Sequence, residues 1–146
     1  MPNIEINYLA ILIAVVANFI LGFIWYTPLF GKVWGKEMGF DMTRKPPAGA
    51  MMKGMIIMVI GNFLMAYVFA HNIAAWNPVS WGLAPSEISP TVNALTAAFF
   101  TWLGFFLPQD LNTVAWEMKS WKLFFINTTY HLLALIVVAL IIVLMG

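Results

Sequence analysis

The C-terminal stretch from Trp121 to Gly146 constrains the fold of this chain more than any other part of the sequence. It contains no Asp, Glu, Lys or Arg between Leu123 and Met145, and no polar side chain at all from Leu132 to Met145. A helix rises about 1.5 Å per residue, so the uncharged part covers roughly 35 Å, enough to cross a hydrocarbon layer of about 30 Å. The stretch therefore predicts a membrane span whose polar side chains lie in its first third.

Three further apolar stretches of similar length precede it. Together the four predict an all-α fold, an integral membrane bundle of four transmembrane helices, in a single domain covering residues 1–146. We place the spans at residues 6–26, 51–71, 90–107 and 121–145. The third has a good helix start, because Ser89 suits the N-cap and Pro90 the first helical position. The connections are then residues 27–50, 72–89 and 108–120.

The composition agrees with a membrane protein and excludes several other classes. The chain is 62% hydrophobic and only 9% charged, whereas soluble domains are about 25% charged, so much of its surface must face lipid. A net charge of +1 leaves no basic patch for nucleic acid. The chain has no Cys and only two His, and no Ser-His-Asp set falls on one side of the membrane. We therefore predict no metal, no cofactor, no catalytic residue and no enzymatic activity.

The basic residues are distributed on one side of the predicted topology. All of them belong to connections 27–50 and 108–120 or to the adjoining helix ends: Lys32, Lys36, Arg44, Lys45, Lys53, Lys119 and Lys122. The positive-inside rule therefore places these two connections in the cytoplasm and both termini, with connection 72–89, on the outer side.

The first connection, residues 27–50, has two interpretations. Val33, Trp34 and Met38 fall on one helical face and charged residues on the others, which suits a short helix in the membrane interface. The alternative is a solvated loop anchored by one Trp. Aromatic side chains near the predicted span ends are expected to anchor the protein at the headgroup level. These candidate anchors are Trp25, Tyr26, Trp34, Trp76, Trp81, Trp116 and Trp121.

Two parts of the chain match each other in order and spacing. The tripeptide Leu-Gly-Phe at residues 21–23 recurs at residues 103–105, and Trp34 recurs as Trp116, each 82 positions later. One interpretation is that the protein contains two parallel helical-hairpin repeats. The other is that residues common in membrane proteins match by chance.

Polar side chains inside the spans form the candidate site. Counted by helix rise from the basic side, most fall in that half of the bundle. The members of this candidate polar layer are Asn18, Asn62, Thr101, Asn127, Thr128 and His131. The layer is either a hydrated cavity for a polar solute or lipid headgroup, or a set of interhelical hydrogen bonds, and single amides commonly serve in the second way.

His131 is the most informative member of the layer. It shares a helix face with Asn127 and Thr128, and Asn127 is its expected partner. An ionisable group within a membrane is a functional hypothesis by default, and the alternative is a neutral, packed imidazole. No Asp or Glu lies inside a predicted span, which argues against proton-coupled transport, because the proton needs a group to reside on.

The order of short motifs resembles a known family. The sequence carries, in order, Ile6-Asn7-Tyr8, Leu21-Gly22, Trp25-Tyr26, Pro28, Phe30-Gly31-Lys32, Trp34, Trp102-Leu103-Gly104-Phe105, Trp121-Lys122-Leu123-Phe124, Ile126-Asn127 and Tyr130-His131. This pattern resembles the bacterial family catalogued as domain of unknown function 1761. The resemblance implies a small four-span protein of the bacterial inner membrane, and it carries over no catalytic residues.

These observations favour a non-enzymatic packing module that forms a homo-oligomer or joins a larger membrane complex, with membrane lipid as its surroundings. The alternative is a small-solute permease or lipid-binding protein that uses the polar layer. A packing module should show Gly22, Gly54, Gly61 and Gly104 at helix contacts. A permease should instead show a cavity lined by Asn18, Asn62 and His131.

Overall fold

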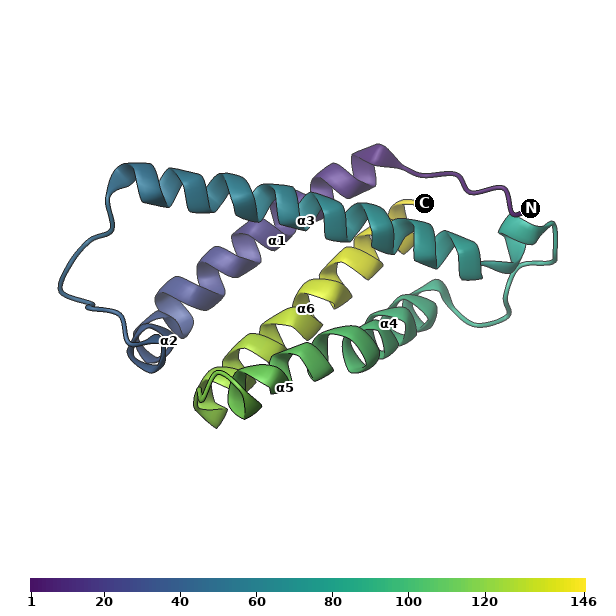
Figure 1. Ribbon diagram of the computed structural model, residues 1–146. Helices are drawn as coiled ribbons and strands as arrows, with labels where there is room; N and C mark the ends of the chain where they lie inside the picture. The colour runs from purple at the N-terminus through teal and green to yellow at the C-terminus, as the bar shows by residue number, and fades with distance from the viewer.

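The computed structural model describes residues 1–146, and its helices are joined by loops with no strands (Figure 1). Four helical stretches are long and apolar enough to cross a membrane: Tyr8–Leu29, Ala48–Trp76, Pro90–Ala115 and Trp121–Met145. The predicted all-α, four-span bundle is therefore confirmed.

The first half of the chain begins with α1 (Tyr8–Ile24), which the side chain of Asn7 caps by accepting from the backbone N–H of Ala10. A π-helical segment, η1 (Trp25–Leu29), follows and leads into α2 (Gly31–Met38). The first connection thus contains a short helix. Helix α2 ends where Gly39 adopts a left-handed conformation with φ 78°. After a loop, α3 (Ala48–Trp76) returns along the bundle.

The second half begins with the 3-10 segment η2 (Pro78–Trp81) and a loop. The next helices are α4 (Pro90–Thr101), the π-helical segment η3 (Trp102–Phe106), α5 (Leu107–Ala115) and α6 (Trp121–Met145). The predicted start is confirmed, since the Ser89 hydroxyl accepts from the N–H of Val92. The helix does not end near Leu107 as expected, because Pro108 occupies the first turn of α5, where a missing N–H is tolerated.

The same order of elements occurs twice in the chain. A long helix, a π-helical segment, a short helix and a second long helix form α1–η1–α2–α3 and again α4–η3–α5–α6. Each π-helical segment begins with a tryptophan, Trp25 or Trp102. The structure therefore matches Trp25 with Trp102, whereas the 82-residue spacing of the Leu-Gly-Phe tripeptides does not align the two segments.

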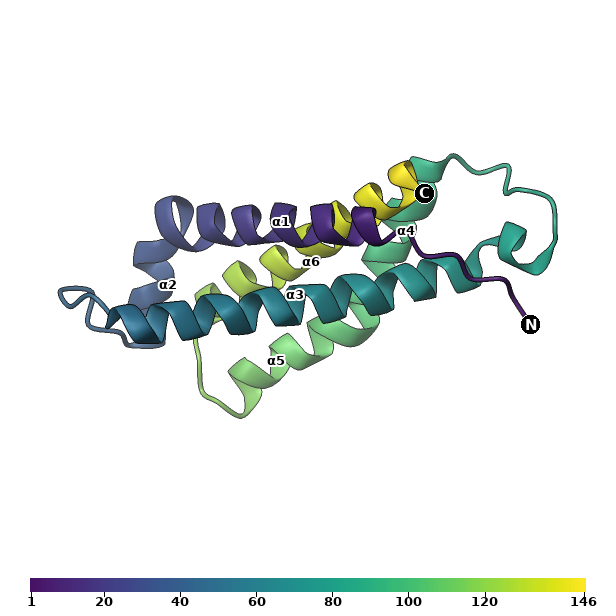
Figure 2. The same cartoon turned by 90° about the horizontal axis from the view of Figure 1, so that it is seen from above.

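Helix α6 lies at the centre of the bundle and packs against α4 and α1, while α1 also packs against α3. Figures 1 and 2 show both termini at one end of the molecule and the short helices α2 and α5 towards the other. Many core residues are alanines, which let the helix backbones approach closely. The core consists of Ile11, Ala14, Val15, Ala66, Phe69, Ala70, Ala94, Ala98, Leu135, Val138 and Ala139.

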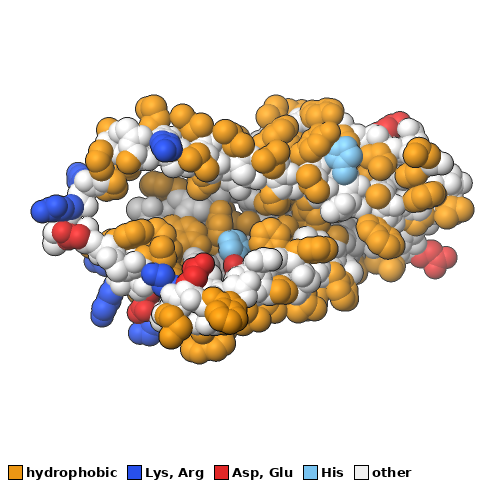
Figure 3. All heavy atoms as spheres, in the orientation of Figure 1, with side chains coloured by type: hydrophobic (Ala, Val, Ile, Leu, Met, Phe, Trp, Pro, Cys, Tyr) orange, Lys and Arg blue, Asp and Glu red, His pale blue; other side chains and the backbone are white.

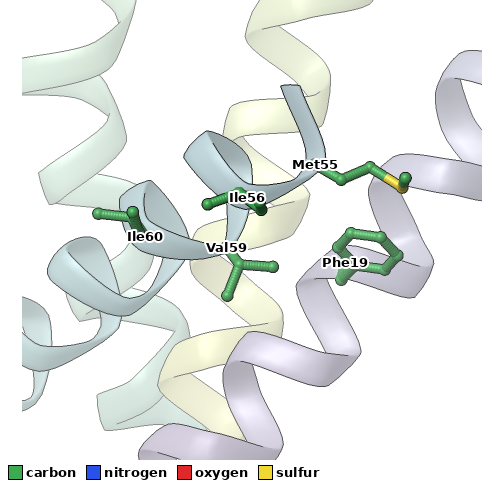
Figure 4. Close-up of a pocket in the computed structure, with 5 residues that line it drawn as sticks. All are labelled: Phe19, Met55, Ile56, Val59 and Ile60. Carbon is green, nitrogen blue, oxygen red and sulfur yellow. The ribbon is translucent and has the colours of Figure 1, made fainter. Parts of the chain in front are cut away.

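Helix α3 is packed over only part of its length. Its buried residues, Ala66, Phe69 and Ala70, all lie in its C-terminal half. Between the N-terminal half and α1 runs an open, apolar groove, in which Phe19 faces Met55 and Val59 (Figure 4). The space-filling view shows the surface hollowed between α3 and α5 at this end, where Lys and Arg side chains also gather (Figure 3). The N-terminal half of α3 thus diverges from the bundle at the basic end.

Candidate functional site

A short polar contact between helices joins Asp110 of α5 to His131 of α6. The Oδ2 atom of Asp110 and the Nδ1 atom of His131 are 2.7 Å apart, and their side chains are 11% and 30% exposed. Asp110 lies within the helical stretch Pro90–Ala115, which is long enough to cross a membrane. From the sequence, no acidic residue was expected in a helix that could span a membrane, and Asp110 lies in one because the helix continues through Pro108.

The apolar surroundings of Asp110 explain why it is buried. Phe106, Asp110 and Val114 follow at four-residue spacing, so they share one helix face. The ring of Phe106 lies 5.4 Å from the imidazole of His131, centroid to centroid. The hydroxyl of Thr113 donates to the backbone carbonyl of Asp110 at 2.7 Å. Packing of this face on α6 therefore carries the carboxylate into the bundle.

A second polar contact lies beside this pair and involves two tyrosines. The hydroxyl of Tyr26 donates to the Oδ1 atom of Asn127 at 2.7 Å. The ring of Tyr130 lies 5.1 Å from that of Tyr26 and 5.8 Å from that of His131. Gly22 leaves room for Tyr130, since a Cβ atom at Gly22 would lie 2.9 Å from the tyrosine hydroxyl. These contacts form one group, which we call the aromatic–acid cluster: Tyr26, Phe106, Asp110, Asn127, Tyr130 and His131.

The two π-helical segments hold α6 in place through tryptophans. The Nε1 atom of Trp25 donates to the carbonyl of Ile126 at 3.0 Å. The Nε1 atom of Trp102 lies 3.0 Å from both the carbonyl oxygen and the hydroxyl oxygen of Thr128. π-Helical turns commonly occur at functional positions in helices. Here both segments fix the polar part of α6 from opposite halves of the chain.

The predicted polar layer divides in the structure. Asn127, Thr128 and His131 join the contacts just described, but His131 pairs with Asp110 rather than with Asn127. Asn18 is fully buried with neither amide atom hydrogen-bonded, and the Nδ2 atom of Asn62 also lacks a partner. Thr101 is half-buried on α4.

The candidate aromatic anchors also fall into two groups. Trp25 and Tyr26 bond to α6, and the ring of Trp34 lies 5.3 Å from that of Tyr26. The other four are exposed: Trp76, Trp81, Trp116 and Trp121.

Sequence reasoning missed Asp110 and gave Tyr26 only an anchoring role. A signal for Asp110 was available, because Phe106 and Val114 place it on an apolar helix face. Its pairing with His131, 21 positions away, has no signal in a single sequence. No third His, Asp or Glu joins the pair to form a set of metal ligands.

Comparison with known proteins assigns the chain to a family. The family model described as "Protein of unknown function (DUF1761)" matches residues 9–143. No curated protein and no solved structure matches the chain. Because the match covers nearly the whole sequence, the chain belongs to the DUF1761 family of membrane proteins of unknown function.

Proposed function

We propose that this protein is a small permease or lipid-binding protein that takes a polar solute or headgroup into the basic half of its bundle, with Asp110 and His131 as its proton-binding group. The observation that carries the proposal is the 2.7 Å contact between these two side chains. Ionisable groups inside a membrane are costly, and they typically mark substrate pathways or proton relays.

The geometry of the pair suits reversible protonation. A carboxylate only accepts hydrogen bonds, so we assign a proton to Nδ1 of His131, which donates to Asp110. The Nε2 atom then remains free to gain or lose a proton. The imidazole is partly exposed, so the pair can be reached from outside the bundle.

Proteoliposomes with an entrapped pH-sensitive dye test the proposal. A panel of quaternary ammonium ions, carboxylates, sugars and zwitterions is added outside vesicles that contain wild-type protein, Asp110→Asn or His131→Gln. We expect at least one class to change the internal pH with wild-type protein, and the response to disappear in both variants. Vesicles with Glu87→Gln, an exposed acid in the connection between η2 and α4, serve as the control. A panel without any response in wild-type protein overturns the proton-linked permease.

Assembly through α3 is the second candidate function, and a specific observation favours it. Gly54 and Gly61 lie seven positions apart on α3, and a Cβ atom at either would meet nothing within 4 Å. Small residues allow close approach of another membrane helix. Light scattering in mild detergent should therefore show a homo-oligomer that Gly54→Leu and Gly61→Leu dissociate, whereas Gly49→Leu, near the start of α3, should not. A monodisperse wild-type monomer contradicts this candidate.

A further inference from the structure

We infer that the aromatic–acid cluster binds an organic cation, such as a quaternary ammonium group, and that this cation competes with one proton for the Asp110–His131 pair. The inference rests on the proposed function and names the chemical class of its ligand.

The charge of the pair selects for a cation. His131 bonds only one carboxylate oxygen of Asp110, and no donor in the protein bonds the other, Oδ1. No Lys or Arg pairs with Asp110, since the only such ion pair in the chain joins Arg44 to Asp41. When the imidazole is neutral, the pair therefore carries one uncompensated negative charge, which attracts cations and repels anions, most strongly where water is scarce.

The aromatic rings around the pair favour an organic cation over a metal ion. Phe106 and Tyr130 lie next to the imidazole, and Tyr26 lies next to Tyr130. Aromatic faces attract cations within about 6 Å, and sites for quaternary ammonium groups are typically built from several such rings. One carboxylate and one imidazole are too few ligands for a typical protein metal site, whereas a carboxylate beside aromatic rings suits a soft, weakly hydrated cation.

The fold leaves a way to reach the cluster. The side chain of His131 keeps 30% of its surface exposed. The surface between α3 and α5 is hollowed (Figure 3), because α3 packs on the bundle mainly through its C-terminal half. Apolar side chains such as Ile56 and Ile60 are exposed on the diverging half. A cation that carries an alkyl chain can therefore approach from the membrane.

Competition with the proton follows from the two nitrogens of His131. A proton on Nε2 makes the imidazole positive and cancels the charge of Asp110, so a second cation is no longer attracted. Conversely, a bound cation disfavours the imidazolium, and one proton leaves Nε2 for water when the cation enters. Between pH 5 and 8 the phenols of Tyr26 and Tyr130 do not ionise. The other charged groups on the neighbouring elements and turn make no ion pair with Asp110 or His131: Lys32, Lys36, Glu37, Lys53, Glu117 and Lys119.

Calorimetry on the full-length protein in uncharged maltoside micelles tests the inference, with octyltrimethylammonium as the probe. Octanol and octyl sulfate, which share its alkyl chain, are the matched neutral and anionic controls. We expect the cation to bind at pH 8, to bind at least about tenfold more weakly at pH 5, and to release protons into weak buffer as it binds at the lower pH. Equal binding of octyl sulfate would show simple insertion of the alkyl chain and overturn the inference.

Three variants separate the roles of the two residues. Asp110→Asn should weaken binding about tenfold or more, because it removes the charge with little change in volume. His131→Gln should keep the binding and lose its dependence on pH. Glu117→Gln, an exposed acid after α5, should behave as wild type. Full binding by Asp110→Asn, or an unchanged pH dependence in His131→Gln, contradicts the inference.

The proteoliposome panel distinguishes failure of this inference from failure of the proposed function. A response to carboxylates, sugars or zwitterions without one to quaternary ammonium ions refutes the cation and leaves the proton-linked function standing. A panel without any response refutes both.

Discussion

Replacing Asp110 and His131 by apolar residues of similar size should show how strongly α5 and α6 depend on their contact. We consider Asp110→Leu, His131→Phe and the double variant. Removing one partner of a buried polar pair strands the other without a hydrogen bond, whereas replacing both with apolar groups can be nearly neutral. The two single variants should therefore each be less stable than wild type, and the double variant should recover much of that loss.

The exposed fractions of the two side chains set the expected magnitudes. His131→Phe strands the carboxylate, which is 11% exposed, so little water can replace the lost bond, and a cost of about 2–3 kcal/mol is expected. Asp110→Leu strands an imidazole that is 30% exposed, so its lost hydrogen bond is more easily replaced and the cost should be about 1 kcal/mol. The double variant should be about 1–3 kcal/mol more stable than the sum of the two single losses predicts.

The assay is reversible unfolding in mixed micelles with increasing mole fraction of dodecyl sulfate, followed by circular dichroism. The free energy of unfolding of all four proteins gives a double-mutant cycle. Additive effects, with a coupling below about 0.5 kcal/mol, would refute the argument that the contact stabilises the α5–α6 packing. A larger loss for Asp110→Leu than for His131→Phe would refute the reasoning from exposure.

Three further predictions concern other parts of the molecule. Trp102→Phe removes the indole donor to α6 and should lower the free energy of unfolding by about 0.6–1.5 kcal/mol. Trp121 is exposed and makes no such bond, so Trp121→Phe should have little effect on stability. Equal losses in the two variants would contradict this prediction. Hydrogen bonds from the hydroxyl and then the backbone N–H of Thr43 lower the pKa of Asp41. In Thr43→Ala, the midpoint of the Asp41 carboxyl titration, followed by ¹³C NMR, should therefore move to higher pH. An unmoved midpoint would refute these hydrogen bonds as the cause. A reporter fused after Gly146 should be active only on the outer side of the membrane, because all basic residues lie towards the opposite end, and cytoplasmic activity would overturn the topology.

The sequence alone was sufficient for the fold class and the span count. Long apolar stretches leave a chain few choices in lipid, since every backbone N–H and C=O must be bonded within its own helix. For this reason the last span was predicted with the bounds that α6 has, Trp121–Met145. Local signals also sufficed for helix starts, as the hydroxyl of Ser89 shows by accepting from the N–H of Val92.

The span ends were harder to predict where a helix changes its winding. Pro108 was expected to end the third span, but the π-helical segment before it lets the chain continue as α5 with the proline in a first turn. The consequence is large, because those extra turns hold Asp110 and bring it against His131 of α6. Local propensity describes a proline correctly as a helix breaker, and it does not reveal that a helix can restart at that residue.

The partners of the polar side chains were decided only by the tertiary structure. The sequence placed Asn127 and His131 on one face of a helix, and the structure bonds them to Tyr26 and Asp110 from two different parts of the chain. Helix periodicity fixes which residues share a face, because it follows from the geometry of one helix. Which face meets which neighbour depends on the rotation and crossing of whole helices, and these are set by the packing of all their side chains together.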